Sequence, residues 1–184
     1  MTKLSILIRT IPQRKETLLP RLLKCLEPQL TDEVEVMVDD SYPMVTGSKA
    51  NMMISKAKGE YCIFIDDDDL VAPYYVDSML KAISLNPDVV SIEGDSFDEN
   101  NKLRYHYIQK LQCKDWGFDE ESVLRTGCTG ISAFKTKFGK FNLFPDIDYF
   151  EDRDFAKNIQ KFARTEIHIL PVMYFHHFKV KKDY

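Results

Sequence analysis

Four consecutive aspartates, Asp66 to Asp69, directly follow the short apolar segment 61–65. The apolar residues predict a buried strand, so the carboxylates are expected at its carboxyl end. Like charges this close repel one another unless a cation lies among them. Carboxylate oxygens are the ligands that Mg²⁺, Mn²⁺ and Ca²⁺ prefer. Because ligands of open α/β sheets bind at the carboxyl ends of strands, the pattern predicts a metal-assisted site.

Two other interpretations of the acidic run concern its local structure. Taken alone, the run could also be a solvated loop. A calcium loop of the EF-hand type fits poorly, because Val71 stands at the sixth position, where glycine is needed, and Asp77 at the twelfth, where glutamate is needed.

Size and composition predict one soluble globular domain. The chain has 184 residues, 44% of them hydrophobic, and a formal net charge of −4, which gives no electrostatic case for nucleic acid as the main partner. The four cysteines form no CxxC pair, so neither a disulfide scaffold nor a zinc site is expected. We expect no signal peptide and no transmembrane segment, and therefore a cytoplasmic protein. The basic segment 179–182 is expected to be solvated.

Strands and helices alternate in the first half of the chain. The pattern predicts strands at 3–8, 34–38, 61–65 and 88–92, and helices at 14–26, 48–58 and 73–85. Pro20 indicates either a kink or a helix that begins there, Ser48 is expected as an N-cap, and Gly59 as a stop. This order is typical of a mostly parallel α/β sheet. Asp39 and Asp40, which end the second strand, are then expected to face the same crevice as the acidic run.

The second half is less regular. The turn at 98–101 predicts a hairpin between strands 91–97 and 103–108, and the stretch 113–130 is expected to be irregular. Within it, the glycines of 126–130 suit either an ordinary turn or a close approach of the backbone to another group. A strand at 131–134, a helix at 150–162 and strands at 166–170 and 173–178 complete the prediction.

Five landmarks in order resemble the family 2 glycosyltransferases of the GT-A fold, which use nucleotide sugars. The segments are similar to that family's first strand and threonine, its second strand and acidic pair, the helix before its metal strand, its DXD motif and its ED motif. In this chain they are LSILIRT at 4–10, VEVMVDDS at 34–41, GSKAN at 47–51 with AKGEY at 57–61, IFIDDDD at 63–69, and EDRDFA at 151–156 after FPD at 144–146.

The resemblance implies a GT-A-type nucleotide-diphospho-sugar transferase fold, with a mostly parallel central sheet and helices on both faces. It implies a single domain, 1–184, with a nucleotide-binding half at 1–95 and an acceptor-binding half at 96–184. The chain departs from the family in three places: Arg9 stands where many members have proline, Ser41-Tyr42 replaces Gly-Ser, and Ala50 stands where arginine is frequent.

The resemblance also implies roles for particular residues. Asp66 and Asp68 would hold Mn²⁺ or Mg²⁺, with one of His176 and His177 as a further ligand, since neighbours on a strand point to opposite faces. Asp152 would be the catalytic base and Glu151 would assist, although both acids could simply favour a helix N-terminus. The implied nucleotide-binding residues are Thr10, Arg14, Asp39, Asp40, Lys49, Asp66 and Asp67. Of these, Arg14 and Lys49 could equally be exposed helix charges.

The implied activity is metal-dependent, inverting transfer of one sugar from a UDP-sugar to an acceptor hydroxyl. The acceptor could be a glycan, a lipid-linked sugar or another hydroxyl compound, and a nucleic acid acceptor stays open. Trp116, Tyr105 and Tyr107 could stack on an acceptor sugar or pack in the core. Two alternatives remain: a degenerate nucleotide-sugar-binding protein without activity, and a haloacid-dehalogenase-like phosphatase with Asp66 as nucleophile.

Overall fold

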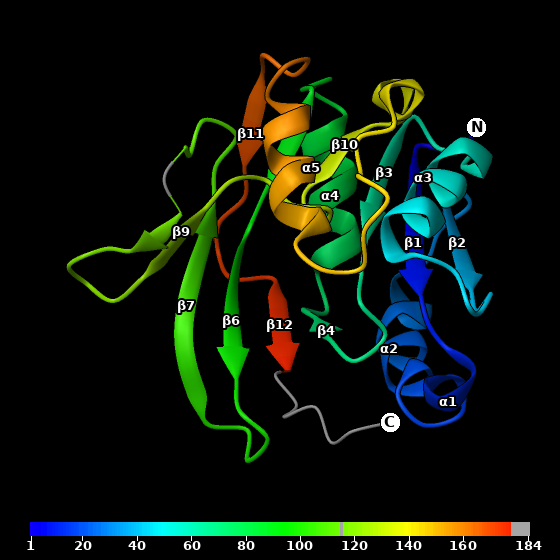
Figure 1. Cartoon of the computed structure of the whole chain (residues 1–184), viewed down its shortest axis with the longest axis horizontal. Helices are drawn as coiled ribbons and strands as arrows, with labels where there is room; N and C mark the ends of the chain where they lie inside the picture. Colours follow the sequence, from blue (N-terminus) through cyan, green and yellow to red (C-terminus); the bar gives the residue numbers. More distant parts are fainter. Residues whose placement is uncertain (115, 178–184) are drawn as a thin grey trace.

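Two sheets and five α-helices make up the computed structural model, which describes residues 1–114 and 116–177 (Figure 1). The first half contains β1 Leu4–Arg9, α1 Pro12–Lys15, α2 Leu19–Leu26, the 3-10 helix η1 Glu27–Gln29, β2 Val34–Asp39, α3 Thr46–Lys56, β3 Tyr61–Phe64, β4 Leu70–Val71, α4 Tyr75–Ile83 and β5 Val89–Ser91. The second half contains β6 Glu93–Phe97, β7 Leu103–Gln109, β8 Gly117–Phe118, β9 Leu124–Thr126, β10 Ala133–Lys135, the 3-10 helix η2 Thr136–Phe141, α5 Glu151–Ile159, β11 Glu166–His168 and β12 Tyr174–His177.

The first sheet carries the strand ends that form the site. Its order is β11-β5-β10-β3-β1-β2, and β1 pairs in parallel with both β2 and β3. β10 is the exception, since it lies antiparallel between β3 and β5. The mostly parallel sheet that the sequence predicts is therefore present, and the β1, β2 and β3 carboxyl ends share one edge.

Helices cover both faces of this sheet, as predicted. Along β3, Tyr61 and Ile63 join one apolar cluster while Cys62 and Phe64 join another, because successive side chains point to opposite faces. The first cluster also contains buried residues of α2 and α4, and the second contains those of α3 and α5. Burial on both faces explains why the strand sequences are almost continuously apolar.

The second sheet packs beside the first and completes the site. Its order is β4-β12-β6-β7-β9-β8, and Figure 1 shows β12, β6 and β7 side by side at the flank of the molecule. The predicted hairpin is β6 and β7. β12 runs parallel to β6 and antiparallel to β4, the short strand that follows the acidic run. This pairing brings the last described strand next to the β3 end.

Several local predictions differ from the structure. The predicted helix at 14–26 is two helices, and the second begins at Leu19 with Pro20 in its first turn. Ser48 is not an N-cap: α3 begins two residues earlier, and the Ser48 hydroxyl donates to Asp146 instead. The stretch 113–130 contains β8 and β9, so it is less irregular than predicted. Phe178, at the end of the strand predicted for 173–178, and the basic segment 179–182 lie outside the described residues.

The predicted halves are interleaved in space. Phe134 of β10 is the register partner of both Cys62 in β3 and Val89 in β5. The second half thus supplies an interior strand to the sheet of the first. Across residues 1–114 and 116–177, no helix combines the length and apolar character needed to cross a membrane.

Candidate active site

A cleft of about 510 Å³ opens where β1, the acidic run, β12 and the start of α5 meet. Nine of the predicted site residues line it: Thr10, Arg14, Lys49, Asp66, Asp67, Asp68, Glu151, Asp152 and His176. The predicted residues Asp39, Asp40 and His177 are not in this lining. The fold therefore brings together most of the residues singled out from the sequence, from segments far apart in the chain.

The first two aspartates of the run differ in exposure. Asp66 keeps 40% of its side chain exposed to the cleft. Asp67 is almost fully buried, and its carboxylate accepts hydrogen bonds from the Thr10 hydroxyl at 2.5 Å and from Arg14 at 2.8 Å. The Thr10 hydroxyl and the Asp67 carboxylate are therefore hydrogen-bond partners, and this contact holds the end of β3 against the end of β1.

The last two aspartates of the run also differ in exposure and in their contacts. Asp68 is 18% exposed and lies 3.5 Å from the Arg14 guanidinium, and burial, followed by the charge of Asp66, raises its pKa. Asp69 is buried and accepts hydrogen bonds from the Tyr174 hydroxyl at 2.7 Å and the His177 backbone N–H at 2.9 Å. Asp69 thus holds β12 in place.

The two histidines of β12 have different positions. His176 lines the cleft, and its Nδ1 lies 3.2 Å from the Ser96 hydroxyl. Burial lowers the pKa of His176 despite the nearby charges of Asp66 and Asp68, which favours the neutral imidazole that coordinates metals. The His177 ring stacks on Phe97, at 5.7 Å between centroids. Of the pair, His176 is the one whose side chain lines the cleft with Asp66 and Asp68.

Glu151 and Asp152 begin α5 and also line the cleft. The preceding residue, Phe150, adopts a left-handed conformation with φ 66°, which turns the chain sharply into the helix. Burial raises the pKa of Asp152 to about 7, with Arg9 acting against this rise and Glu151 and Asp66 adding to it. A carboxyl group with this pKa can accept a proton near neutral pH.

Arg9, the last residue of β1, contacts acids from both ends of the site, Asp66 after β3 and Glu151 at the start of α5. Its guanidinium lies 3.3 Å from Asp66 and 3.2 Å from Glu151, and it sits over the Phe64 ring at 5.1 Å. Burial opposes the charge of Arg9, but Asp66, Asp152 and Glu151 outweigh it and raise the pKa of Arg9. The sequence shows Arg9 only as a departure from the family pattern. Its site position could have been suspected because it ends a buried strand directly before Thr10.

The β2 end borders the cleft rather than lining it. Asp40 pairs with Lys15 at 2.7 Å, and Asp39 accepts a hydrogen bond from the Ser41 backbone N–H at 3.0 Å. Lys49 is buried, and its ammonium donates to the Thr10 carbonyl at 2.9 Å and to the Asp39 carbonyl at 3.2 Å. Lys49 therefore fastens α3 to the β1 and β2 ends, and it is not an exposed helix charge.

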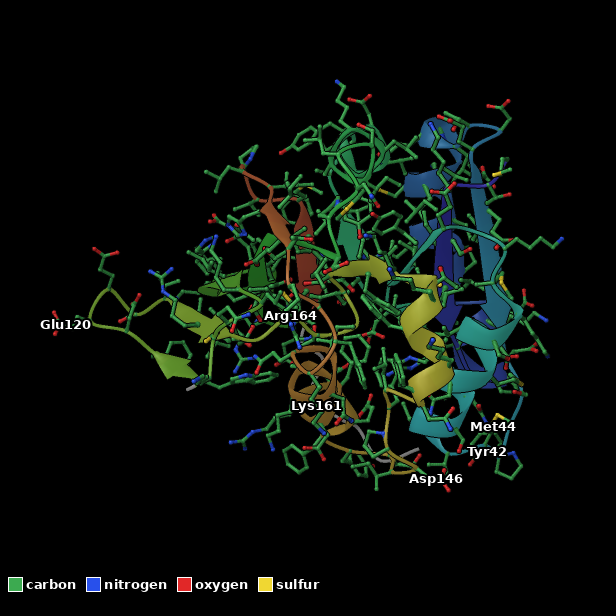
Figure 2. The ribbon with its side chains drawn as sticks, turned by 90° about the horizontal axis from the view of Figure 1, so that it is seen from above. Tyr42, Met44, Glu120, Asp146, Lys161 and Arg164 are labelled. Carbon is green, nitrogen blue, oxygen red and sulfur yellow. The ribbon has the colours of Figure 1, made fainter. Side chains whose placement is uncertain are left out.

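The outer rim is a feature that the sequence did not reveal. Tyr42, Met44 and Tyr149 line the cleft, and Tyr42 and Tyr149 are 66% and 65% exposed. Figure 2 shows the labelled Tyr42, Met44 and Asp146 at one corner of the molecule. Asp148 ties the loop before α5 to the first residue of α3, because it accepts hydrogen bonds from the Thr46 backbone and hydroxyl at 2.9 and 3.1 Å.

The aromatic residues considered for acceptor stacking lie elsewhere. Tyr107 is buried in the core. Tyr105 packs edge-on against Phe118 at 5.4 Å, and Trp116 lies near Gly127. None of the three lines the cleft. For Tyr107, core packing is the correct alternative.

The chemistry of the lining suits a hard divalent cation only in part. Asp66, Asp68 and His176 offer two carboxylates and an imidazole from one cleft. In the described part of the chain, however, no three or more histidine, cysteine, aspartate or glutamate residues are grouped so that they could hold a metal ion. Mg²⁺ sites commonly use one or two carboxylates plus substrate phosphates. The residues therefore fit a cation whose coordination a bound phosphate compound completes.

Known proteins resemble this chain in sequence and in structure. EpsH of Bacillus subtilis (strain 168), which is named as a glycosyltransferase, is 27% identical over 149 residues, covering 73% of this chain and 41% of EpsH. The crystal structure of S. aureus TarS 1-349 with UDP-GlcNAc gives a TM-score of 0.69 at 15% identity, covering 98% of this chain and 60% of that one. The UDP complex of TarS 1-349 gives 0.69 at 16% identity, covering 96% and 61%.

These relatives are longer than the chain, which spans less than two thirds of each. The structural match shows that the fold is of the GT-A type. The profile of Glycosyl transferase family 2 matches residues 46–147, more than half of the chain and including the acidic run at the β3 end. The chain therefore belongs to glycosyl transferase family 2.

Proposed function

We propose that this chain carries the donor site and the catalytic base of a metal-dependent, inverting glycosyltransferase that moves one sugar from a UDP-sugar to an acceptor hydroxyl. One observation carries the proposal: the acids at the β3 end and those at the start of α5 line one cleft, with the Arg9 guanidinium in contact with both Asp66 and Glu151. A transferase needs both groups in one cleft, because a diphosphate must leave the same anomeric carbon that the deprotonated acceptor hydroxyl attacks. Family membership and fold leave no place for the phosphatase alternative.

The wall at the β3 end would receive the donor. Asp66, Asp68 and His176 would hold Mn²⁺ or Mg²⁺, which when bound neutralises the charge of the departing diphosphate. Thr10, Arg14, Lys49 and Asp67 would shape the nucleotide site, and Asp67 would act by fixing Thr10 and Arg14. Asp39 and Asp40 border the cleft where the base and ribose would lie. UDP is proposed because TarS 1-349 has been crystallised with UDP and with UDP-GlcNAc.

The wall at the start of α5 would serve the acceptor. The Asp152 carboxylate would remove the proton of the acceptor hydroxyl as its oxygen attacks the anomeric carbon. The C–O bond forms as the bond to the diphosphate breaks, so the configuration of the sugar is inverted. Glu151 would hold the Arg9 guanidinium beside this step. A glycan, a lipid-linked sugar or another hydroxyl compound would be the acceptor.

Ligand binding and sugar transfer can be tested separately. We expect UDP with Mn²⁺ to raise the melting temperature, since a ligand that binds only the folded state stabilises it. Asp68→Ala and His176→Ala should lower this rise, whereas His177→Ala should leave it nearly unchanged. Release of UDP from UDP-sugars, with water as the acceptor, should fall at least 100-fold in Asp152→Asn while UDP binding is retained.

Asp154→Asn is the matched control, because Asp154 lies two residues further along α5, pairs with Lys157 and is outside the cleft lining. A wild-type protein that binds UDP and Mn²⁺ but never releases UDP from any UDP-sugar would favour the alternative of a nucleotide-sugar-binding protein without activity. Equal loss of UDP release in Asp152→Asn and Asp154→Asn would refute the role of Asp152.

A further inference from the structure

Arg9 neutralises part of the acidic charge in the cleft. Its side chain is only 12% exposed, and its two terminal nitrogens contact different acids, Asp66 at 3.3 Å and Glu151 at 3.2 Å. The stacking distance of 5.1 Å to Phe64 further limits where the guanidinium can move. The guanidinium is thus held by two carboxylates, one on each terminal nitrogen, and by an aromatic ring. The planar group of arginine can make these contacts together, and the ammonium of lysine cannot.

The oxygen that Arg9 contacts belongs to Asp66, the most exposed acid of the run and a proposed metal ligand. A divalent cation that binds Asp66 must therefore share this carboxylate with Arg9 or displace the guanidinium from it. Displacement leaves the buried Arg9 guanidinium with one acidic partner fewer, and an uncompensated buried charge is costly. A diphosphate in the cleft would offer the guanidinium a new anionic partner.

We propose that Arg9 is a resident counter-cation that makes metal binding depend on the donor: its guanidinium pairs with Asp66 when no ligand is bound, and it would move to the diphosphate if a metal ion bound Asp66. This inference rests on the proposed metal and donor site. In this account the free protein binds metal weakly, and the donor and the metal strengthen each other's binding. Because such coupling is reciprocal, Arg9 also makes donor binding depend on the metal.

The test measures binding alone, with Mn²⁺ and UDP as the probes. Calorimetric titrations give the Mn²⁺ affinity without and with saturating UDP for the wild type, Arg9→Met and Arg9→Lys. In Arg9→Met, Mn²⁺ alone should bind about 10-fold more tightly than in the wild type, because no cation competes for Asp66. The factor by which UDP tightens Mn²⁺ binding should fall about 10-fold. Arg9→Lys keeps the positive charge but loses the two-nitrogen guanidinium contact. Its Mn²⁺ affinity and the effect of UDP on it should lie between those of the wild type and Arg9→Met.

Arg125→Met is the matched control for lost charge, because Arg125 pairs with Asp119 and lies outside the cleft lining. It should leave both Mn²⁺ affinities unchanged. Mn²⁺ binding to Arg9→Met that is weaker than, or equal to, that of the wild type would overturn the proposal. If Arg9→Met does not fold, Arg9→Lys serves as the test, and Mn²⁺ alone should again bind more tightly than in the wild type. A folded wild type that binds neither Mn²⁺ nor UDP would overturn the proposed function as well, whereas normal wild-type binding with unchanged variants overturns the Arg9 inference only.

Discussion

Asp152 shows how environment changes the chemistry of an ordinary residue. Burial in the cleft wall raises the pKa of this carboxyl group to about 7, above the value of about 3.9 for an unfolded chain. A carboxyl group whose pKa is raised by folding destabilises the folded state when it is ionised. The cost is absent below the unfolded pKa, grows between the two values and is complete above about pH 7.

The first prediction follows at this scale. Asp152→Asn should stabilise the metal-free protein at pH 8 by a few kcal/mol, since one pKa unit corresponds to about 1.36 kcal/mol. The gain should shrink as the pH falls and vanish below about pH 3, where the wild-type carboxyl is protonated in both states. Urea unfolding of both proteins at several pH values measures this difference. A gain that is constant with pH would contradict the raised pKa.

At the scale of elements, close packing between α3 and the loop before α5 sets the shape of the cleft rim. The Gly47 backbone N–H donates to the Ile147 carbonyl at 3.1 Å, and an added Cβ at Gly47 would lie 1.6 Å from the Pro145 carbonyl oxygen. That neighbour is backbone, so it cannot turn aside as a flexible side chain would. A side chain at position 47 must therefore push the loop and α3 apart.

The second prediction is that Gly47→Ala destabilises the protein and weakens donor binding together. We expect a loss of about 1–3 kcal/mol, the usual range for overpacking, and a lower UDP affinity because Thr46 and Asp148 of the rim shift. Thermal unfolding and UDP titration measure both effects. Ser55→Ala, in the same helix but exposed, is the control. Unchanged stability and UDP affinity in Gly47→Ala would show that the rim accommodates the methyl group.

The amino-acid sequence predicts structure best where one residue type has one physical consequence. The apolar run before Asp66 predicts a buried strand with charge at its end, and β3 has this form. Local sequence patterns mislead where a contact from a distant segment decides the local structure. Ser48 suits an N-cap, yet its hydroxyl is engaged by Asp146 from another loop. Arg9 and the rim tyrosines likewise take their places from partners that no local spacing identifies.

At the scale of the whole molecule, the two sequence halves depend on each other. β10 lies between β3 and β5, so residues 1–95 alone leave β3 paired on one side only, with β1, and leave β5 with neither of its partners. The third prediction is that a 1–95 fragment does not fold, whereas residues 1–184 do. Circular dichroism and the dispersion of amide resonances in an NMR spectrum distinguish the two results. A cooperative unfolding transition in the fragment would contradict this dependence.

The inserted β10 strand also has a consequence for synthesis in the cell. A ribosome makes β3 and β5 well before it reaches Ala133, and at about 5–20 residues per second the nascent chain waits for several seconds. During this interval the apolar strands β3 and β5 present open edges, which are templates for aggregation. The nascent β10 strand ends the exposure of the two edges that face each other, because it pairs with both β3 and β5.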